Sequence, residues 1–268
     1  MKYFDLNAWV GAWPFRALRD NTPQDLLARL QRAGIERAAV GQIEAAFQRQ
    51  VQPANEQLAA ALEPFPSLLP MAALNPAYPH WQDDLRRCHE ELGMRGVRLY
   101  PVYHDYAADS PEAVQAVAAC KERGLPVFLP HRLEDNRQRH WMDPGRMLDL
   151  GQVADLIAQV PKARVVVTNA RGLAQTALWR RADIRDAAWF FDLSLAEVHY
   201  VLHKDIKRMG DMAGFIAEGG APHLVFGTHA PFSYPSAAVV KATVLPVDKD
   251  ELKAICWGRA MDLLGVEA

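Results

Sequence analysis

The chain has 268 residues, of which half are hydrophobic and 23% are charged, and its formal net charge is −2. This composition predicts a globular protein with a large core, and the balanced charge argues against nucleic acid as a partner. No apolar run approaches the ~20 residues needed to cross a bilayer, and the N-terminal segment lacks a signal-peptide pattern. We therefore expect a cytoplasmic protein without membrane contact. An odd number of widely spaced cysteines indicates reduced, buried thiols.

Eight short apolar runs follow one another along the chain, at residues 3–10, 36–43, 68–74, 96–102, 125–130, 163–169, 189–195 and 223–229. Most of them lack strict alternation, which is typical of strands buried on both faces of a parallel sheet. Amphipathic segments with helical spacing separate the runs, for example at 22–34, 111–124 and 147–160.

Capping residues support these helices. Thr22 and Ser110 each precede a proline and are predicted N-caps, while Gly34 and Gly124 stand where a left-handed residue commonly ends a helix. Alternating strands and helices without a linker predict a single (β/α)8 TIM-barrel domain over residues 1–268. The alternative is a doubly wound open sheet. That fold usually carries a Gly-rich phosphate-binding turn after its first strand, and this chain has none.

The residues at the C-terminal ends of the strands are the functional candidates, because a barrel of this type carries its active site there. The first run contains DLNAW (5–9), the fourth contains GVRLYP (96–101), and the eighth leads into FGTHAPF (226–232). The fifth and sixth runs lead to His131 and Asn169. The polar segment 132–146 follows the fifth run and is predicted to cover the barrel mouth.

Together these segments resemble the amidohydrolase-related (amidohydrolase 2) family, and the resemblance extends from Phe4 to about Leu264. Members of that family open with Asp-x-His-x-His and carry Gly-x-Arg/Lys-Leu-x-Pro at the fourth strand. Histidines follow at the fifth and sixth strands, and Phe-Gly-Ser/Thr-Asp-x-Pro-Phe at the eighth. The resemblance implies a TIM barrel that hydrolyses C–N or C–O bonds, opens lactones or decarboxylates acids.

The chain departs from this family at positions that the resemblance assigns to metal ligands. The two histidines of the first strand fall on Asn7 and Trp9, the histidine of the sixth on Asn169, and the aspartate of the eighth on His229. Only His131 remains of the usual set. A neutral amide is a poor ligand for zinc, and indole has no available lone pair. The metal-activated hydroxide of the family is therefore not expected here.

Two histidines and one aspartate are the predicted catalytic residues. His131 and His229 should both face the mouth, as an acid/base pair, as the nucleus of a remodelled metal site, or as histidines held by hydrogen bonds without chemistry. Asp5 shares a strand face with Asn7 and is the third candidate, although the resemblance implies a structural role for it. The predicted substrate-binding residues are Asn7, Trp9, Arg98, Tyr100, His104 and Asn169.

The surroundings of three of these residues can also be predicted. Arg98 is expected inside the barrel, where it needs a carboxylate partner, either an acidic substrate or a protein group such as Glu44 or Asp192. His104 is expected on the loop after the fourth strand. Trp9 is expected to fill the space left by the metal or to stack on a flat ligand.

Two patterns follow the seventh run. Ser194 and Glu197 have the spacing of a capping box, which favours a helix start over a substrate contact for Ser194. His199 and His203 lie four residues apart, a spacing that can hold a metal on a helix. No glutamate stands between them in the His-Glu-x-x-His manner, so a plain helix surface is the favoured interpretation.

Three functions are compatible with this pattern. The first is a metal-independent hydrolase or lyase acting on a small polar compound (acidic, lactone or carbohydrate-derived), in which a histidine activates water and Arg98 binds a carboxylate. The second is a hydrolase with a rebuilt metal site, for example for zinc, around His131 and His229. The third is a non-catalytic, ligand-binding pseudoenzyme. No cofactor is expected under the first, the partner is a small molecule in each case, and a homo-oligomer is compatible with the sequence.

Overall fold

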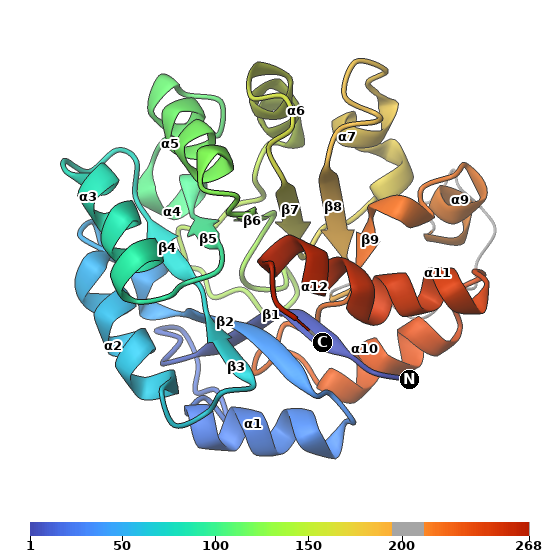
Figure 1. Cartoon of the computed structure of the whole chain (residues 1–268), viewed down its shortest axis with the longest axis horizontal. Helices are drawn as coiled ribbons and strands as arrows, with labels where there is room; N and C mark the ends of the chain where they lie inside the picture. The colour runs from blue at the N-terminus through green and yellow to red at the C-terminus, as the bar shows by residue number, and fades with distance from the viewer. Residues whose placement is uncertain (195–211, 268) are drawn as a thin grey trace.

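The apolar runs form parallel strands with helices outside them in the computed structural model, which describes residues 1–194 and 212–267 (Figure 1). The strands are β1 (Phe4–Val10), β2 (Arg37–Gln42), β3 (Leu68–Pro70), β4 (Ala72–Leu74), β5 (Val97–Leu99), β6 (Val127–Pro130), β7 (Val165–Thr168), β8 (Trp189–Asp192) and β9 (Leu224–Val225).

The α-helices of the described residues are α1 (Pro23–Arg32), α2 (Gln52–Leu62), α3 (Trp81–Arg86), α4 (Pro101–His104), α5 (Pro111–Glu122), α6 (Leu150–Gln159), α7 (Ala177–Arg180), α9 (Met212–Ala217), α10 (Pro235–Thr243), α11 (Lys249–Lys253) and α12 (Arg259–Leu264). Short 3-10 or π segments are η1 (Glu44–Phe47), η2 (Arg87–Glu91), η3 (Leu173–Gln175), η4 (Ala221–His223) and η5 (Ala254–Gly258).

The strands close into a barrel. They pair in parallel in the orders β1-β2-β3 and β4-β5-β6-β7-β8-β9. Only Met71 separates β3 from β4, and its N–H still donates to the Val40 carbonyl at 2.9 Å. Residues 68–74 therefore form one continuous strand of the barrel. The ring closes where the Leu6 N–H donates to the Phe226 carbonyl at 3.0 Å and the His229 N–H to the Asn7 carbonyl at 2.8 Å. The predicted (β/α)8 barrel is confirmed.

Two strands end where the backbone turns left-handed. β7 ends at Thr168, directly before Asn169 with φ of 58°, and the segment after β9 reaches His229 with φ of 61°. A strand cannot continue through such a residue, and asparagine and histidine are among the side chains that tolerate it best. The apolar runs are therefore longer than the strands, and the turns place Asn169 and His229 at the mouth of the barrel.

The fourth run shows the same shortening for another reason. Its strand ends at Leu99, and Pro101 begins the short helix α4, which ends at His104. The expectation that His104 lies on a loop is therefore wrong. Proline has the fixed φ of a first helical residue and lacks the N–H that a strand would use, so it starts a helix here instead of extending β5.

The predicted helix caps are confirmed. The Thr22 hydroxyl accepts from the Asp25 N–H at 3.2 Å, and the Ser110 hydroxyl accepts from the Ala113 N–H at 3.3 Å. Gly34 and Gly124 follow α1 and α5 with φ of 77° and 67°. The helix predicted at 147–160 begins only at Leu150, because the carboxylate of Asp149 caps it.

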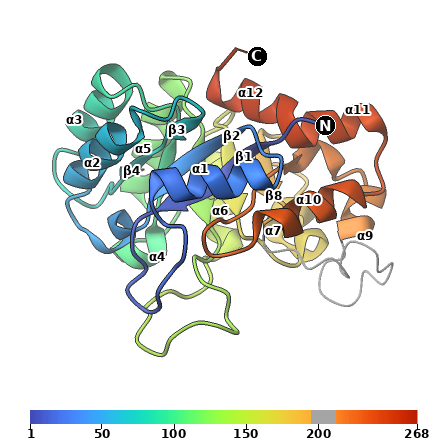
Figure 2. The same cartoon turned by 90° about the horizontal axis from the view of Figure 1, so that it is seen from below.

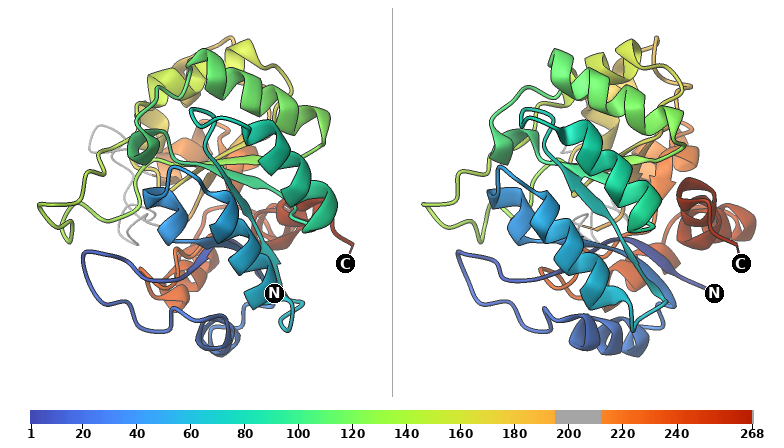
Figure 3. Two further views of the ribbon diagram at one scale, coloured as in Figure 1. Left: turned by 90° about the vertical axis from the view of Figure 1, so that its left-hand side faces the viewer. Right: turned by 60° about the vertical axis from the view of Figure 1, so that its left-hand side comes forward.

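The two ends of the barrel differ in chemistry. Apolar side chains from the first halves of the strands fill one end, and helix α12 closes it with Ala260, Met261 and Leu264. The loops 11–22 and 131–149 project from the opposite end (Figures 2 and 3). The Leu148 N–H donates to the His131 carbonyl at 2.8 Å and closes the base of the longer loop. The segment 132–146 thus lies at the mouth end, as predicted.

The mouth loops contact each other. The Arg16 Nε donates to the Glu134 carboxylate at 2.8 Å, and the rings of Phe15 and His140 stack with centroids 5.9 Å apart.

The three cysteines are buried free thiols, in agreement with the prediction. Over the described residues, no helix has the length and apolar character needed to cross a bilayer.

Candidate active site at the barrel mouth

Asp5 connects the first and last strands of the barrel. Its Oδ1 accepts from the Asn7 and Thr228 N–H groups, both at 2.9 Å, and its Oδ2 accepts from the Thr228 hydroxyl at 2.5 Å. The side chain is fully buried, and this burial raises the pKa of Asp5 to about 6. Both oxygens are thus engaged in holding the backbone next to Asn7 and His229.

Asn7 is the centre of a buried hydrogen-bond network. Its Nδ2 donates to Asn169 Oδ1 at 2.8 Å and to Asp192 Oδ2 at 2.7 Å, and its Oδ1 accepts from Trp9 Nε1 at 2.8 Å. A second donor to Oδ1 is an Arg98 nitrogen at 3.4 Å. A carboxamide has two N–H donors and two lone pairs, so all its capacity is used within the protein.

The far side of this network is equally satisfied. Asp192 Oδ1 accepts from the Asn169 N–H at 2.8 Å, and Asn169 Nδ2 donates to the Arg132 carbonyl at 2.7 Å. The Ser194 hydroxyl lies 2.6 Å from Asn169 Oδ1 and 2.9 Å from Asp192 Oδ1. Burial raises the pKa of Asp192. We call the group formed by Asn7, Trp9, Asn169, Asp192 and Ser194 the mouth network.

Ser194 and its neighbours bear on two predictions. The Ser194 hydroxyl points into the mouth network, and the predicted cap with Glu197 lies outside the described residues, as do His199 and His203.

Sequence reasoning missed Lys241, a buried lysine of α10 whose Nζ donates to the Leu193 and Ser194 carbonyls at 2.6 and 2.5 Å. Its only sequence signal is a charged residue on the apolar face of a helix.

Arg98 lies inside the barrel, as predicted, but not beside a carboxylate. Its guanidinium stacks 3.9 Å from the centre of the Trp9 ring and donates to the carbonyls of Ala8 and Ala39 at 3.3 Å. Gly41 makes room for it, since a Cβ there would lie 2.8 Å from the Arg98 Nε. Glu44 accepts from the Ala12 N–H at 2.6 Å and Asp192 from Asn7, so the pairing with a protein carboxylate is wrong, and an acidic substrate as the partner of Arg98 stays a prediction.

Tyr100 and His104 pack on the Trp9 side of the mouth network. The Tyr100 and Trp9 ring centres are 6.2 Å apart, and the His104 ring meets Tyr100 edge-on at 5.5 Å. His104 Nε2 is bonded to the Ala45 carbonyl at 3.1 Å, whereas the buried Tyr100 hydroxyl has no partner in the described part of the chain. Burial raises the pKa of Tyr100 and lowers that of His104.

His229 differs from the neighbouring His104 because neither of its ring nitrogens has a partner among the described residues, whereas the Nε2 of His104 is bonded. Three buried ring nitrogens form no hydrogen bond with residues 1–194 or 212–267. They are both nitrogens of His229 and the Nδ1 of His131. The His229 ring is 1% exposed and stacks on Phe232 with centroids 4.5 Å apart and planes 4° apart. Such unsatisfied buried groups are rare in proteins.

Both imidazoles are neutral at physiological pH. Burial, followed by the guanidinium groups of Arg132 and Arg171, lowers the pKa of His131 to about 4. Burial, Arg132 and Arg98 lower the pKa of His229 well below its ordinary value. The charge of Arg132 thus acts on both rings, and the mouth is an electropositive site with two neutral bases.

The chain belongs to the amidohydrolase family, whose sequence model matches residues 6–266. No curated protein matches it in sequence. Among solved structures, it resembles a dihydroxybenzoic acid decarboxylase from a Polaromonas species with bound manganese and an inhibitor, at 16% identity and a TM-score of 0.72, over 98% of this chain and 97% of that one.

Two further solved structures show the same fold. A 5-carboxyvanillate decarboxylase from Sphingomonas paucimobilis is 12% identical, with a TM-score of 0.72 and 99% of each chain covered. A protein named as a probable 2-pyrone-4,6-dicarboxylic acid hydrolase from Acinetobacter baumannii, with citric acid bound, is 14% identical, with a TM-score of 0.63 over 99% of this chain and 100% of that one.

The mouth does not fit the metal centre that the family resemblance implies. Within the described ranges, no three His, Cys, Asp or Glu side chains come together in a group that could hold a metal ion. The carboxamide of Asn7 is saturated, and the indole of Trp9 donates its N–H to it. A protein zinc site needs at least three deprotonated N, O or S ligands, and His131 and His229 supply only two.

Proposed function

We propose that the chain is a metal-independent hydrolase that cleaves a C–O bond in a small carboxylic acid or its lactone, with His229 and His131 as the acid/base residues. One observation carries this proposal. Two buried imidazoles at the mouth have ring nitrogens without partners among the described residues, whereas the side chains of Asn7, Asn169 and Asp192 bond to one another. A buried group that the fold leaves unpaired is available to a substrate.

The electropositive mouth supports an acidic substrate. The charges that act on His229 come mainly from Arg132, Arg98 and Arg16, and the acidic Asp135 opposes them with a smaller effect. A carboxylate entering this site would be attracted by the guanidinium groups and would itself favour protonation of the imidazole. The names of the structurally similar proteins, which include a dicarboxylic acid hydrolase and acid decarboxylases, agree with this substrate class.

The protonation state favours hydrolysis over decarboxylation. At pH 7 a neutral imidazole accepts a proton from water, and the resulting hydroxide attacks the carbonyl carbon of the substrate. The C–O bond to the leaving group then breaks, and the imidazolium returns its proton to the leaving oxygen. Decarboxylation of an aromatic acid instead requires a proton donor at the ring carbon, and in the free protein His131, with a pKa of about 4, carries no proton to donate at pH 7.

The metal independence of this mechanism rests on the donor set. A metal at the family position would have to displace the bonds that Asn7 makes to Asn169 and Asp192. Such a displacement would leave buried polar groups unpaired, at a cost of about 1–3 kcal/mol for each. No step of the proposed reaction therefore passes through a metal.

The test is a hydrolysis screen of lactones, sugar acids and aromatic carboxylic esters, run with and without a chelator. We expect activity that survives the chelator and falls about 10²- to 10⁴-fold in His229→Gln and His131→Gln. His80→Asn is the matched control, because His80 is exposed and its left-handed φ of 68° suits asparagine. Activity lost to the chelator and restored by zinc, manganese or iron would favour the rebuilt metal site and refute the proposal.

A second candidate is a barrel that binds a ligand without turnover. The observation in its favour is that the His229 ring is 1% exposed beneath Phe232, which restricts the approach of water. In that case calorimetry would show binding of an acid that weakens in His229→Gln, and no product would form at any pH. The first candidate requires product formation, so the two are separated by a single time course.

A further inference from the structure

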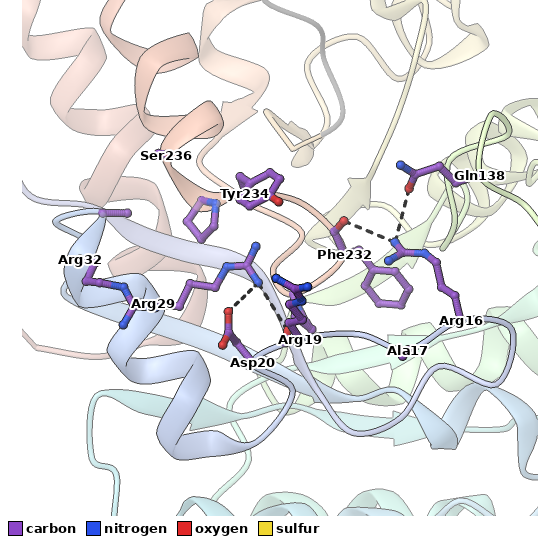
Figure 4. Close-up of a pocket in the computed structure, with 13 residues that line it drawn as sticks. Arg16, Ala17, Arg19, Asp20, Arg29, Arg32, Gln138, Phe232, Tyr234 and Ser236 are labelled. Atoms are coloured by element: carbon purple, nitrogen blue, oxygen red, sulfur yellow. Dashed lines mark hydrogen bonds and ion pairs between the residues drawn. The ribbon is translucent and has the colours of Figure 1, made fainter.

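A cavity lies beside the barrel mouth and is lined in part by Phe232 (Figure 4). It has a volume of about 590 Å³ and is enclosed by the loop after β1, by helix α1 and by the start of helix α10. We call it the arginine pocket, and its main lining residues are Arg16, Arg19, Arg29, Arg32, Tyr234 and Ser236.

The lining of this pocket is strongly basic. Four arginines face one acidic residue, Asp20. Arg29 is held in place by Asp20 Oδ2 at 3.1 Å and by the Ser233 carbonyl at 3.2 Å, and its side chain is only 11% exposed. Fixing a charged side chain in this way removes the entropy cost of ordering it on a ligand, so the pocket is partly preorganised for an anion.

Two of the arginines have no counter-charge of their own. The guanidinium groups of Arg19 and Arg32 are exposed and make no hydrogen bond or ion pair with any residue in the described part of the chain. Arginine stays charged at every physiological pH and binds phosphate or carboxylate through paired N–H donors. The chain is slightly acidic overall, with a net charge of −2, so this concentration of positive charge is a local feature.

The start of helix α10 adds a further donor. Its N-cap, Tyr234, provides no side-chain cap, and its first residue is Pro235, which has no N–H. Ser236, the second residue of α10, lines the pocket wall. A helix N-terminus carries a partial positive charge that favours an anion in the same place as the arginines do.

We infer that the arginine pocket binds a small, multiply charged anion, either a phosphorylated compound or a polycarboxylate, at a site separate from the barrel mouth. Its volume lies within the range of small-molecule sites, so a compound larger than a single phosphate fits. The Tyr234 ring, which is 75% exposed and lies 5.1 Å from the Arg29 guanidinium, offers an apolar surface for an organic part of the ligand.

This site extends beyond the function proposed for the mouth, because none of the predicted catalytic or substrate-binding residues lines it. Phe232 is nevertheless shared between the two, since it lines the pocket and stacks on His229 at 4.5 Å. A ligand in the arginine pocket therefore lies behind the ring that covers His229.

The test is calorimetric titration of the full chain with inorganic pyrophosphate and, separately, with citrate, at constant ionic strength. The variant Arg19→Gln/Arg32→Gln removes two exposed guanidinium groups that form no hydrogen bond or ion pair with the described residues, so it should fold normally. We expect its dissociation constant for the tighter anion to rise at least about tenfold, because two charge-assisted contacts are lost.

The matched control is Arg95→Gln/Lys121→Gln, which removes two exposed positive charges outside the pocket. Its affinity should stay within about twofold of the parent chain, since distant surface charges are screened by salt. Tighter binding of pyrophosphate identifies a phosphorylated ligand, and tighter binding of citrate a polycarboxylate. Absence of saturable binding for both anions, or equal weakening in the two double variants, would overturn the proposal. Neither result depends on whether the mouth is catalytic.

Discussion

The two sets of polar side chains at the barrel mouth are satisfied to different degrees. In the mouth network, Asn7 uses both N–H donors and accepts at its oxygen, and Asp192 accepts at both oxygens. In the histidine pair, both nitrogens of His229 and one of His131 have no partner within the described residues. Both sets are buried, so exposure to solvent does not explain the difference.

This difference separates structural from functional polar groups. A fully satisfied buried network stabilises one arrangement of the chain and offers nothing to a ligand. An unsatisfied buried group costs about 1–3 kcal/mol, and native proteins retain such groups where another purpose requires them. The bonds of the mouth network therefore hold β1, β7 and β8 together, while the histidine pair offers unpaired nitrogens, in keeping with the function that we propose for it.

The largest expected effect comes from breaking the mouth network. Asn7→Leu removes the partner of Asn169, Asp192 and Trp9 at once and leaves those polar groups buried and unpaired. We expect the free energy of unfolding to fall by about 3–5 kcal/mol, measured by urea denaturation.

The control for this change is Asn75→Leu. Asn75 is also buried, but among the described residues its side chain bonds only to the Arg49 carbonyl and the Ala77 N–H, so about 1–2 kcal/mol should be lost. Equal losses in the two variants would show that the mouth network has no special role in stability.

A substitution of His131 should change how the free energy of unfolding depends on pH. Folded His131 stays neutral down to about pH 4, whereas in the unfolded chain its pKa is about 6.5, so the unfolded state binds more protons between these values. The wild-type chain should therefore lose about 2 kcal/mol through His131 between pH 7.5 and pH 5. His131→Leu removes this loss, so the variant should be relatively more stable than wild type at pH 5 than at pH 7.5.

Asp5 acts in the opposite direction and must be separated from this effect. Its pKa is raised to about 6 in the folded chain, so its contribution to stability increases as the pH falls from 6 towards 4. It is present in both proteins, and the difference between wild type and His131→Leu cancels it. Identical pH curves for wild type and His131→Leu would contradict the assigned titration.

The barrel could be predicted from the sequence because each strand carries its own local signal. For the barrel mouth, the sequence indicates which residues lie there but not which of them bond to one another. Asn7 and its partners Asn169 and Asp192 are 162 and 185 residues apart, and nothing local indicates that they bond to each other. The helix at Pro101 had a signal in the proline itself, but the apolar run around it suggested a longer strand.

The partner of Arg98 shows a different limit. A buried arginine usually pairs with a carboxylate, and here backbone carbonyls take that place. The pairing of β1 with β2 shifts register between Asp5 and Ala8, and the Leu6 and Ala8 carbonyls both accept from the guanidinium. A β-bulge of this kind depends on how two strands meet, so side-chain patterns in one strand do not reveal it.

The smallest expected effect compares two hydroxyl groups at the mouth. The Ser194 hydroxyl lies 2.6 Å from Asn169 Oδ1, whereas the equally buried Thr168 hydroxyl has no partner within the described residues. Ser194→Ala should lower the free energy of unfolding by about 1 kcal/mol, because a satisfied buried bond is lost. Thr168→Val keeps the shape of the side chain and removes an unpaired polar group, so it should be neutral or slightly stabilising. Thermal or urea unfolding of both variants measures the difference, and a larger loss in Thr168→Val would mean that its hydroxyl is held by a partner such as buried water.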